Sequence, residues 1–175
     1  MSGTVELTTD RLILRRHQPE DAAVLFEILG SDPQMFEYSG WNPYQTKEKA
    51  AETIETFIKS YDDPHFYGWG IVNKGKLVGT IGAYDYDADK NQIEIGMSID
   101  RASWGQGFAT EALIVVLHYL TEDENIQAVT GWCASDNIGS LKAMEKAGMK
   151  RIRLEKEALT INHRMFDKLI FEYTS

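Results

Sequence analysis

The feature that most constrains the fold is a change of hydrophobic period in the middle of the chain. Three apolar segments, FYGWGIV (66–72), KLVGTIGAY (76–84) and QIEIGMSI (92–99), are separated by short turn-forming stretches and predict an antiparallel β-meander. Beyond them the apolar residues recur at helical spacing, and one face carries Ala109, Ala112, Leu113, Val116, Leu117 and Leu120. A chain that passes from consecutive strands into a helix is neither an alternating Rossmann fold nor an all-β sandwich.

The remaining segments predict a mixed α/β (α+β) fold. The expected elements are strands at 11–16, 126–134, 150–159 and 164–174, and helices within 18–29, 46–60 and 137–148. Pro19 suits a first helical turn, and Gly148 suits the position just after a helix. No repeat or linker divides the 175 residues, so we expect a single domain over 1–175.

Charge and residue usage narrow the partners. The net charge of −9 disfavours nucleic acid and anionic membranes, and no apolar run is long enough to span a bilayer. The first residues show no secretory signal, so we expect a cytoplasmic protein, as a monomer or homodimer. The single cysteine, Cys133, excludes an internal disulfide and a cysteine-based zinc site. The four histidines (His17, His65, His118 and His163) lack metal-ligand spacing, so no metal is predicted.

A glycine turn, RASWGQGFATEAL (101–113), leads directly into the predicted central helix. A dinucleotide fingerprint would need a third glycine where Thr110 stands, and a Walker A loop would need Gly-Lys-Ser/Thr. What remains is a strand, a turn with Gly105 and Gly107, and a helix start whose unpaired N–H groups can bind phosphate oxygens. The alternative is an ordinary strand-to-helix turn, because short glycine motifs arise often by chance.

Three stretches together resemble a known family. WGQGFATEAL is similar to the acetyl-CoA diphosphate loop of the GNAT superfamily of N-acetyltransferases, whose pattern is Gln/Arg-x-x-Gly-x-Gly/Ala. Trp104 departs from that first position but is typical of the ribosomal-protein N-terminal acetyltransferase (Rim-like) branch. TTDRLILRRHQPEDAAVLFEIL and SDNIGSLKAMEKAGMKRI resemble two further segments of that branch, with Met149 in place of the usual aromatic residue. The resemblance runs from about residue 8 to residue 173.

The resemblance implies both a fold and a donor site. The fold is a mixed, mostly antiparallel sheet of six or seven strands with about four helices, splayed between strands four and five, here 92–99 and 127–134. Acetyl-CoA is then the acetyl donor. Main-chain groups of Met97 and Ile99 are expected to pair with its pantetheine arm, and Asn137 and Ser140 to lie near that arm. The diphosphate turn would comprise Trp104, Gly105, Gln106, Gly107, Phe108, Ala109 and Thr110.

Two catalytic residues are predicted with this resemblance. Glu94 is the candidate base, acting through a water, although an exposed edge carboxylate or a capping partner is an equal alternative. Asp85 and Asp87 are second candidates, and their residue type favours turn formation. Ser140 is expected to stabilise the departing CoA thiolate by a hydrogen bond, or else to sit in a helix's first turn.

Other polar residues have a structural interpretation that competes with a functional one. Asn137 suits a helix N-cap as well as a pantetheine contact. Tyr173 is a weaker candidate acid and is expected to pack the last strand. Cys133 could form an acyl intermediate, but a buried structural thiol is the favoured interpretation. Lys142 and Lys146 could reach nucleotide phosphates, or could be solvated helix charges.

These observations predict an N-acetyltransferase that transfers the acetyl group directly to a primary amine, on a protein N-terminus or a small molecule. The alternative is a non-catalytic acyl-CoA-binding regulatory module. EYSGWNPYQ (37–45) and SYDDPHFYG (60–68) carry aromatic and acidic residues that could wall an amine site or could be ordinary core edges.

Overall fold

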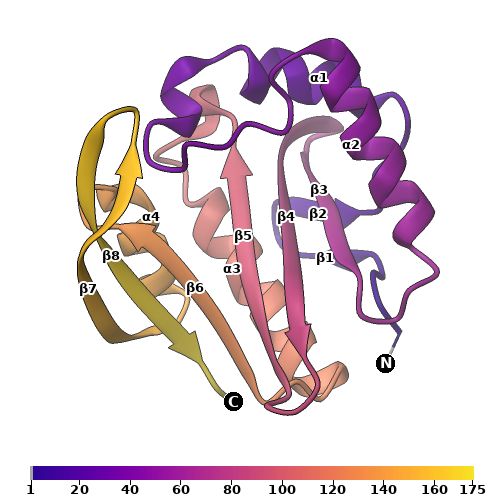
Figure 1. The fold of residues 1–175 in the computed structure, drawn as a ribbon. Coiled ribbons are helices and arrows are strands. Elements are labelled where there is room, and N and C mark those ends of the chain that lie inside the picture. Colours follow the sequence, from indigo (N-terminus) through magenta and orange to yellow (C-terminus); the bar gives the residue numbers. More distant parts are fainter. Residues whose placement is uncertain (1) are drawn as a thin grey trace.

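One eight-stranded sheet organises the computed structural model, which describes residues 2–175. Its spatial order is β1-β2-β3-β4-β5-β6-β8-β7 (Figure 1). The strands are β1 (Leu7–Thr8), β2 (Leu12–Arg15), β3 (Tyr67–Asn73), β4 (Lys76–Asp87), β5 (Gln92–Ile99), β6 (Ala128–Ala134), β7 (Lys150–Ile161) and β8 (Arg164–Tyr173). All neighbours are antiparallel except β5 and β6, which run parallel.

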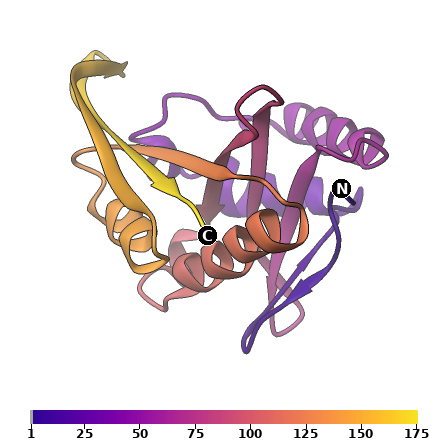
Figure 2. The same ribbon diagram turned by 90° about the horizontal axis from the view of Figure 1, so that it is seen from below.

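Four α-helices cover the two faces of this sheet. They are α1 (Asp21–Leu25), α2 (Lys47–Ser60), α3 (Phe108–His118) and α4 (Ile138–Lys146), and π-helical turns extend α1 to Gly30 and α3 to Asp123. In Figure 2, α1 and α2 lie on one side of the strands and α3 and α4 on the other. No helix within residues 2–175 is long and apolar enough to cross a membrane.

The main core lies between the central strands and α3. It joins buried residues of β2 to β6, such as Trp69, Ile81 and Ile95, to Ala112 and Val116 of α3. A second, smaller core lies under α1 and α2 and includes Leu25, Leu29 and Ile54. Each central strand therefore has apolar side chains toward α3, which leaves its opposite face for α1, α2 and the site described below.

The predicted mixed, mostly antiparallel fold is confirmed, and the segment boundaries agree closely. The predicted strand 92–99 is β5 itself, and the helix predicted within 46–60 is α2, with Thr46 as N-cap accepting from Lys49 N–H. The two-residue strand β1 was not predicted; it pairs with Ile13 and Leu14 of β2 and makes eight strands instead of six or seven. A pair of residues is too short for any periodicity to indicate a strand.

Candidate active site

The two parallel strands part from each other halfway along their length. β5 pairs with β6 only from Gln92 to Glu94, opposite Ala128 to Thr130, although β5 continues to Ile99 and β6 to Ala134. Figure 1 shows the two strands diverging toward their carboxyl ends. The predicted splay is therefore present, between the strands that correspond to 92–99 and 127–134. Crevices at the carboxyl ends of parallel strands are common ligand sites.

The edge of β5 that faces this opening carries main-chain groups of alternate residues. Asp100 N–H donates to Val78 of β4 at 2.7 Å, so the main-chain groups of Asp100 point away from β6. By the alternation of an antiparallel ladder, those of Met97 and Ile99 point toward the opening. The carbonyl of Ile99 accepts a hydrogen bond from Trp104 Nε1 at 2.8 Å. Met97 thus offers both groups to a ligand, whereas the carbonyl of Ile99 already has a partner.

The glycine turn connects the end of β5 to α3. Gly105 and Gly107 have φ of +80° and +81°, values that glycine adopts far more readily than other residues. Gly107 is the N-cap of α3 and has no side chain to satisfy the first-turn N–H groups. Its carbonyl accepts from Glu111 N–H at 3.1 Å, so the N–H groups of Phe108, Ala109 and Thr110 precede the first helical hydrogen bond. Residues 104–107 are exposed, so the turn leads from the surface to these donors and to the positive end of the helix dipole.

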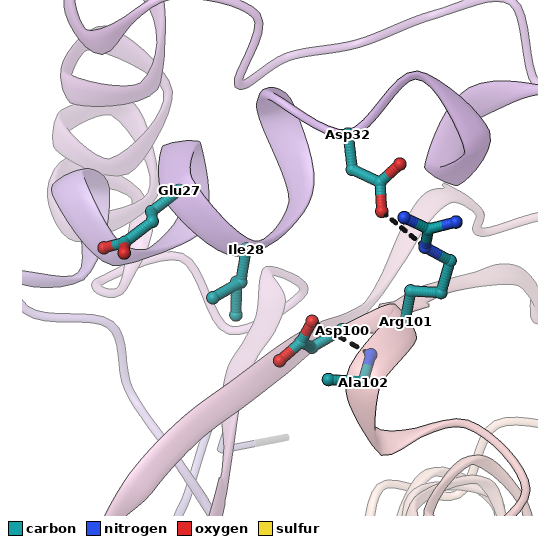
Figure 3. Close-up of a pocket in the computed structure, with 6 residues that line it drawn as sticks. All are labelled: Glu27, Ile28, Asp32, Asp100, Arg101 and Ala102. Atoms are coloured by element: carbon teal, nitrogen blue, oxygen red, sulfur yellow. Dashed lines mark hydrogen bonds and ion pairs between the residues drawn. The ribbon is translucent and has the colours of Figure 1, made fainter.

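A pocket of about 420 Å³ lies beside this turn but has the wrong charge for phosphate. Figure 3 shows its lining, formed by Glu27, Ile28, Asp32, Asp100, Arg101 and Ala102. Arg101 Nε forms an ion pair with Asp32 at 2.9 Å, and Arg101 also donates to Gln34. The three carboxylates outnumber the single guanidinium and repel anions. A diphosphate would therefore rest on the N-terminus of α3 rather than in this pocket.

The second helix start at the opening belongs to α4, which follows β6. Asn137 is its N-cap, and Asn137 Oδ1 accepts from Ser140 N–H at 3.3 Å. Ser140 is half-buried in the first turn. The structural roles foreseen for both residues are present, and both stand at the carboxyl end of β6, where the strands have separated.

Glu94 lies where β5 and β6 part, on the sheet face that carries α1 and α2. Its cross-strand neighbour is Tyr84, and the next pairs on this face are Gly82 with Gly96 and Thr80 with Ser98. The ring of Tyr84 lies over Gly96, where an added Cβ would come within 3.1 Å of it. Burial raises the pKa of Tyr84, and the adjacent Glu94 carboxylate raises it further. The Tyr84 hydroxyl therefore stays protonated beside Glu94 and can donate a hydrogen bond.

The other predicted catalytic residues take structural positions. Asp87 accepts from Asp89 N–H at 3.0 Å and Lys90 N–H at 3.2 Å, which closes the β4–β5 turn. Asp85 is exposed, at a positive φ of 57° in the same irregular stretch. The ring of Tyr173 contacts the position of Gly148, and Tyr173 is the register partner of Val129 at the end of β6 that pairs with β5.

Cys133 is a buried core residue, which confirms the predicted structural thiol. It is 3% exposed and packs in the main core. Burial raises the pKa of this thiol to about 11, so it stays largely protonated at neutral pH. Because the thiolate is the reactive form, Cys133 is a poor nucleophile.

The two segments predicted as acceptor walls differ. In 37–45, Tyr38 packs edge to face on Phe166 of β8 at 5.5 Å, Gly40 contacts Ile161 of β7, and Trp41 is 68% exposed. This segment therefore meets the β7–β8 hairpin at Tyr38 and Gly40, whereas its far end is a core edge, because Tyr44 is buried in the second core. In 60–68, by contrast, Tyr61 and Tyr67 are buried, which makes that segment a core edge.

A buried polar cluster joins the start of α1 to β4. His17 has no exposed side chain, and its Nδ1 and Nε2 lie 3.0 Å from Asp21 and 3.0 Å from Thr80. Arg15 forms two hydrogen bonds with the Asp21 carboxylate, at 2.9 and 3.0 Å. Burial alone would raise the pKa of Asp21, but hydrogen bonds from His17 and Arg15 outweigh it and hold that pKa far below its usual range.

Sequence reasoning missed Tyr84, the indole contact of Trp104, and the side chains that hold the glycine turn from outside. Tyr84 lies ten residues before Glu94, and only the strand register brings the two together. The alternating pattern of the β-meander carries that signal, because Gly82 and Gly96 mark one small-residue face. The partners of the turn come from residues 9–11, about one hundred positions away, and no local pattern indicates them.

Comparison with known proteins places the chain in a family. Residues 11–150 match the model of the Acetyltransferase (GNAT) domain, which is well over half of the chain. The chain therefore belongs to the GNAT acetyltransferase family and is an N-acetyltransferase by class. Among similar proteins, the uncharacterized N-acetyltransferase YoaA of Bacillus subtilis (strain 168) is 28% identical over 167 residues, which is 94% of each chain.

Solved structures agree with this fold. RimL, a ribosomal L7/L12 alpha-N-protein acetyltransferase solved with coenzyme A, has a TM-score of 0.88 at 16% identity and is matched over 97% of this chain and 98% of its own. The microcin C7 self immunity acetyltransferase MccE, solved with acetyl-CoA and AMP, has a TM-score of 0.86 at 16% identity, over 95% and 94%. The predicted resemblance to the GNAT superfamily is confirmed, and the Rim-like structure RimL shares the fold of this chain.

Proposed function

We propose that this chain takes an acetyl group from acetyl-CoA and transfers it directly to a primary amine. The observation that carries the proposal is the opening between β5 and β6. The uncapped start of α3 lies at its carboxyl end, and Glu94 lies at the point where the strands part. A group that bridges these two places needs an anionic end and a long neutral arm, and CoA has both.

The residues present fit the donor. The N–H groups of Phe108, Ala109 and Thr110 suit diphosphate oxygens, and the glycines at 105 and 107 keep side chains out of the way. The main-chain groups of Met97 suit an added strand-like arm, with amides that pair as another strand would. The thioester of acetyl-CoA supplies the activated acetyl group. The two neighbours solved with CoA or acetyl-CoA support this choice of donor.

Glu94 is the proposed general base. A primary amine is mostly protonated at neutral pH and has no lone pair until that proton is removed. Glu94 is half-buried on the α1/α2 face and can accept the proton through a water molecule. The protonated hydroxyl of Tyr84 beside it can orient the carboxylate.

Ser140 is proposed to stabilise the leaving sulfur. A serine hydroxyl is too weak an acid to give up its proton fully, so a hydrogen bond to the departing thiolate is its role. Ser140 stands at the start of α4, where the carboxyl end of β6 faces the opening. Cys133 is buried with a raised pKa, and this favours direct transfer over an acyl-cysteine intermediate.

The acceptor is proposed to be the amine of a peptide N-terminus or of a small molecule. The wall formed by 37–45 and the β7–β8 hairpin presents Trp41 to solvent, and an exposed aromatic ring suits contact with a peptide or an apolar amine. The net charge of −9 favours a cationic acceptor. RimL acts on a protein N-terminus by its name, so N-terminal peptides belong among the acceptors tested.

The decisive experiment measures CoA thiol release from acetyl-CoA across a panel of N-terminal peptides, polyamines and amino-acid amines. We expect at least one amine to accelerate release well above hydrolysis and its acetylated product to appear by mass spectrometry. If CoA raises the melting temperature while no amine accelerates release, the chain is a non-catalytic acyl-CoA-binding module. If ATP stabilises the fold more than CoA does, the donor assignment is wrong.

A further inference from the structure

A side chain from the other end of the sequence holds the glycine turn. Arg11 immediately precedes β2, and its Nη1 donates to the carbonyl of Gln106 at 2.7 Å. Its guanidinium carbon is 4.7 Å from the centre of the Phe108 ring. Its Nη2 lies 3.3 Å from the position that a Cβ on Gly107 would take. Arg11 therefore touches three consecutive residues of the turn.

Arg11 also binds the first turn of α3 through Glu111. Arg11 Nε lies 2.8 Å from Glu111 Oε1, and the main-chain N–H of Arg11 donates to Glu111 Oε2 at 3.0 Å. The hydroxyl of Thr9 donates to the same oxygen. Burial acts to raise the pKa of Glu111, but these hydrogen bonds outweigh it and lower that pKa, so Glu111 is ionised.

The contact with Gln106 determines the direction of one N–H group. In a trans peptide the C=O and the following N–H point in opposite directions. Because the carbonyl of Gln106 is turned toward Arg11, the N–H of Gly107 is turned away from the β1–β2 side. We expect that N–H to be available to a ligand that approaches the start of α3. Arg11 thus fixes a donor that glycine's freedom would otherwise leave loose.

The contact with Glu111 has an electrostatic consequence. A carboxylate in the first turn of a helix lies close to any anion bound at the helix start and repels it. The guanidinium of Arg11 neutralises that charge while it keeps its own planar hydrogen bonds. In a chain of net charge −9, this local compensation matters for a polyanionic ligand.

We propose that Arg11 is a positioning residue for the CoA diphosphate, which orients the Gln106–Gly107 peptide and cancels the charge of Glu111. The inference rests on the proposed donor. It predicts that loss of Arg11 weakens the binding of ligands that carry the diphosphate and does not affect ligands that lack it. A merely structural role would affect both kinds of ligand alike.

The test compares Arg11→Ala with wild type by calorimetric titration of CoA, and by kcat/KM for acetyl-CoA against S-acetylpantetheine, which has no diphosphate. We expect CoA affinity to fall about 30-fold, as for the loss of a hydrogen-bonded charge. The kcat/KM for S-acetylpantetheine should change less than twofold. Arg11→Lys should restore little of the CoA affinity. A lysine ammonium lacks the planar set of donors with which the guanidinium binds both the Gln106 carbonyl and the Glu111 carboxylate.

A double variant isolates the charge effect. Arg11→Ala with Glu111→Gln should bind CoA more tightly than Arg11→Ala alone, by about fivefold, since the unpaired carboxylate is gone. Arg16→Ala is the matched control, because Arg16 also donates to a main-chain carbonyl and lies over an aromatic ring, on residues far from the turn. That control should leave CoA affinity unchanged.

Two results would overturn the role of Arg11. One is a CoA affinity of Arg11→Ala within twofold of wild type, and the other is an equal loss with acetyl-CoA and S-acetylpantetheine. If Arg11→Ala does not fold, the same measurements with acetyl-CoA and S-acetylpantetheine are made on the Arg11→Lys and Glu111→Gln variants. A wild-type protein that does not bind CoA at all would instead refute the proposed donor, and the two failures are therefore distinct.

Discussion

The proposed donor side of the opening presents main-chain groups, whereas the proposed acceptor side presents side chains drawn from several separate segments. The turn from Gly105 to Thr110 offers N–H groups, and its support comes from Arg11 and Glu111, whose side chains are 45% and 20% exposed. The proposed acceptor side combines Glu94, Tyr84 and Trp41, and the same sheet face carries a buried cluster in which His17 and Asp21 are 0% and 5% exposed. A site for an invariant ligand can be built from main-chain groups. Selecting an acceptor instead needs side chains that a buried, rigid cluster holds in place.

The first way to test this contrast removes the proposed base from the acceptor side. Glu94→Gln keeps the shape of the side chain but cannot take a proton, so we expect kcat to fall about 100-fold or more. CoA affinity, measured by calorimetry, should remain within twofold because the donor contacts are untouched. Asp87→Asn is the control, since Asp87 closes a turn in the adjacent loop and asparagine serves turns equally well. Full activity of Glu94→Gln at neutral pH would eliminate Glu94 as the base.

The second experiment removes the buried carboxylate of Asp21 from the polar cluster on the acceptor side. Asp21→Asn leaves Arg15 and His17 without their buried carboxylate, and we expect a loss of about 3 kcal/mol in the free energy of unfolding. The pKa of Asp21 is lowered in the folded state, so its contribution is fully present above the unfolded pKa of about 4 and is lost as pH falls below it. The difference between wild type and variant should therefore narrow below pH 4.

Urea denaturation at pH 7, 5 and 3 measures this difference. Asp62→Asn, at an exposed position in the turn after α2, should cost little at any of the three values. A gap between wild type and Asp21→Asn that stays constant down to pH 3 would contradict the assigned role of the ionised carboxylate.

The third prediction concerns the donor turn, where two glycines allow a matched pair. Gly105 and Gly75 have φ of +80° and +75°, and neither would bring an added Cβ within 4 Å of a neighbour. Alanine at either position therefore costs a similar 1–2 kcal/mol or so of stability. Only Gly105→Ala places a methyl group on the surface where the diphosphate would approach, and we expect about tenfold weaker CoA binding there.

Thermal melts and CoA titrations of both variants check this prediction. If Gly75→Ala weakens CoA binding as much as Gly105→Ala does, the loss reflects general destabilisation and the turn has no special place in donor binding. Equal stability with unequal affinity would support the view that this side of the site is made of main chain.

The same contrast explains what the sequence could predict. The donor turn is local, since glycine spacing, a preceding strand and a following helix are all readable within 101–113. The splay followed from the family resemblance, with the two strands correctly placed. The acceptor side depends on register and packing between distant segments. The pairing of Tyr84 with Glu94 depends on strand register, for which the alternation of the β-meander is a weak signal, and the contact of Tyr38 with Phe166 has no local signature. Arg11 was inside a recognised motif, but its partners lie 95 and 100 residues away.

The smallest expected effect belongs to Tyr84, and it tests how finely the acceptor side is tuned. Tyr84→Phe removes the hydroxyl that lies beside Glu94 but keeps the ring over Gly96, so the sheet face keeps its shape. A single partly exposed hydrogen bond contributes modestly, and we expect kcat to fall about threefold with CoA affinity unchanged. Tyr86→Phe is the control, because its hydroxyl bonds to Asn91 on the same hairpin without approaching Glu94. If both variants lower kcat equally, the hydroxyls support only the hairpin. If Tyr84→Phe alone lowers it, the orientation of the carboxylate is set by a side chain ten residues away in sequence and directly opposite in the sheet.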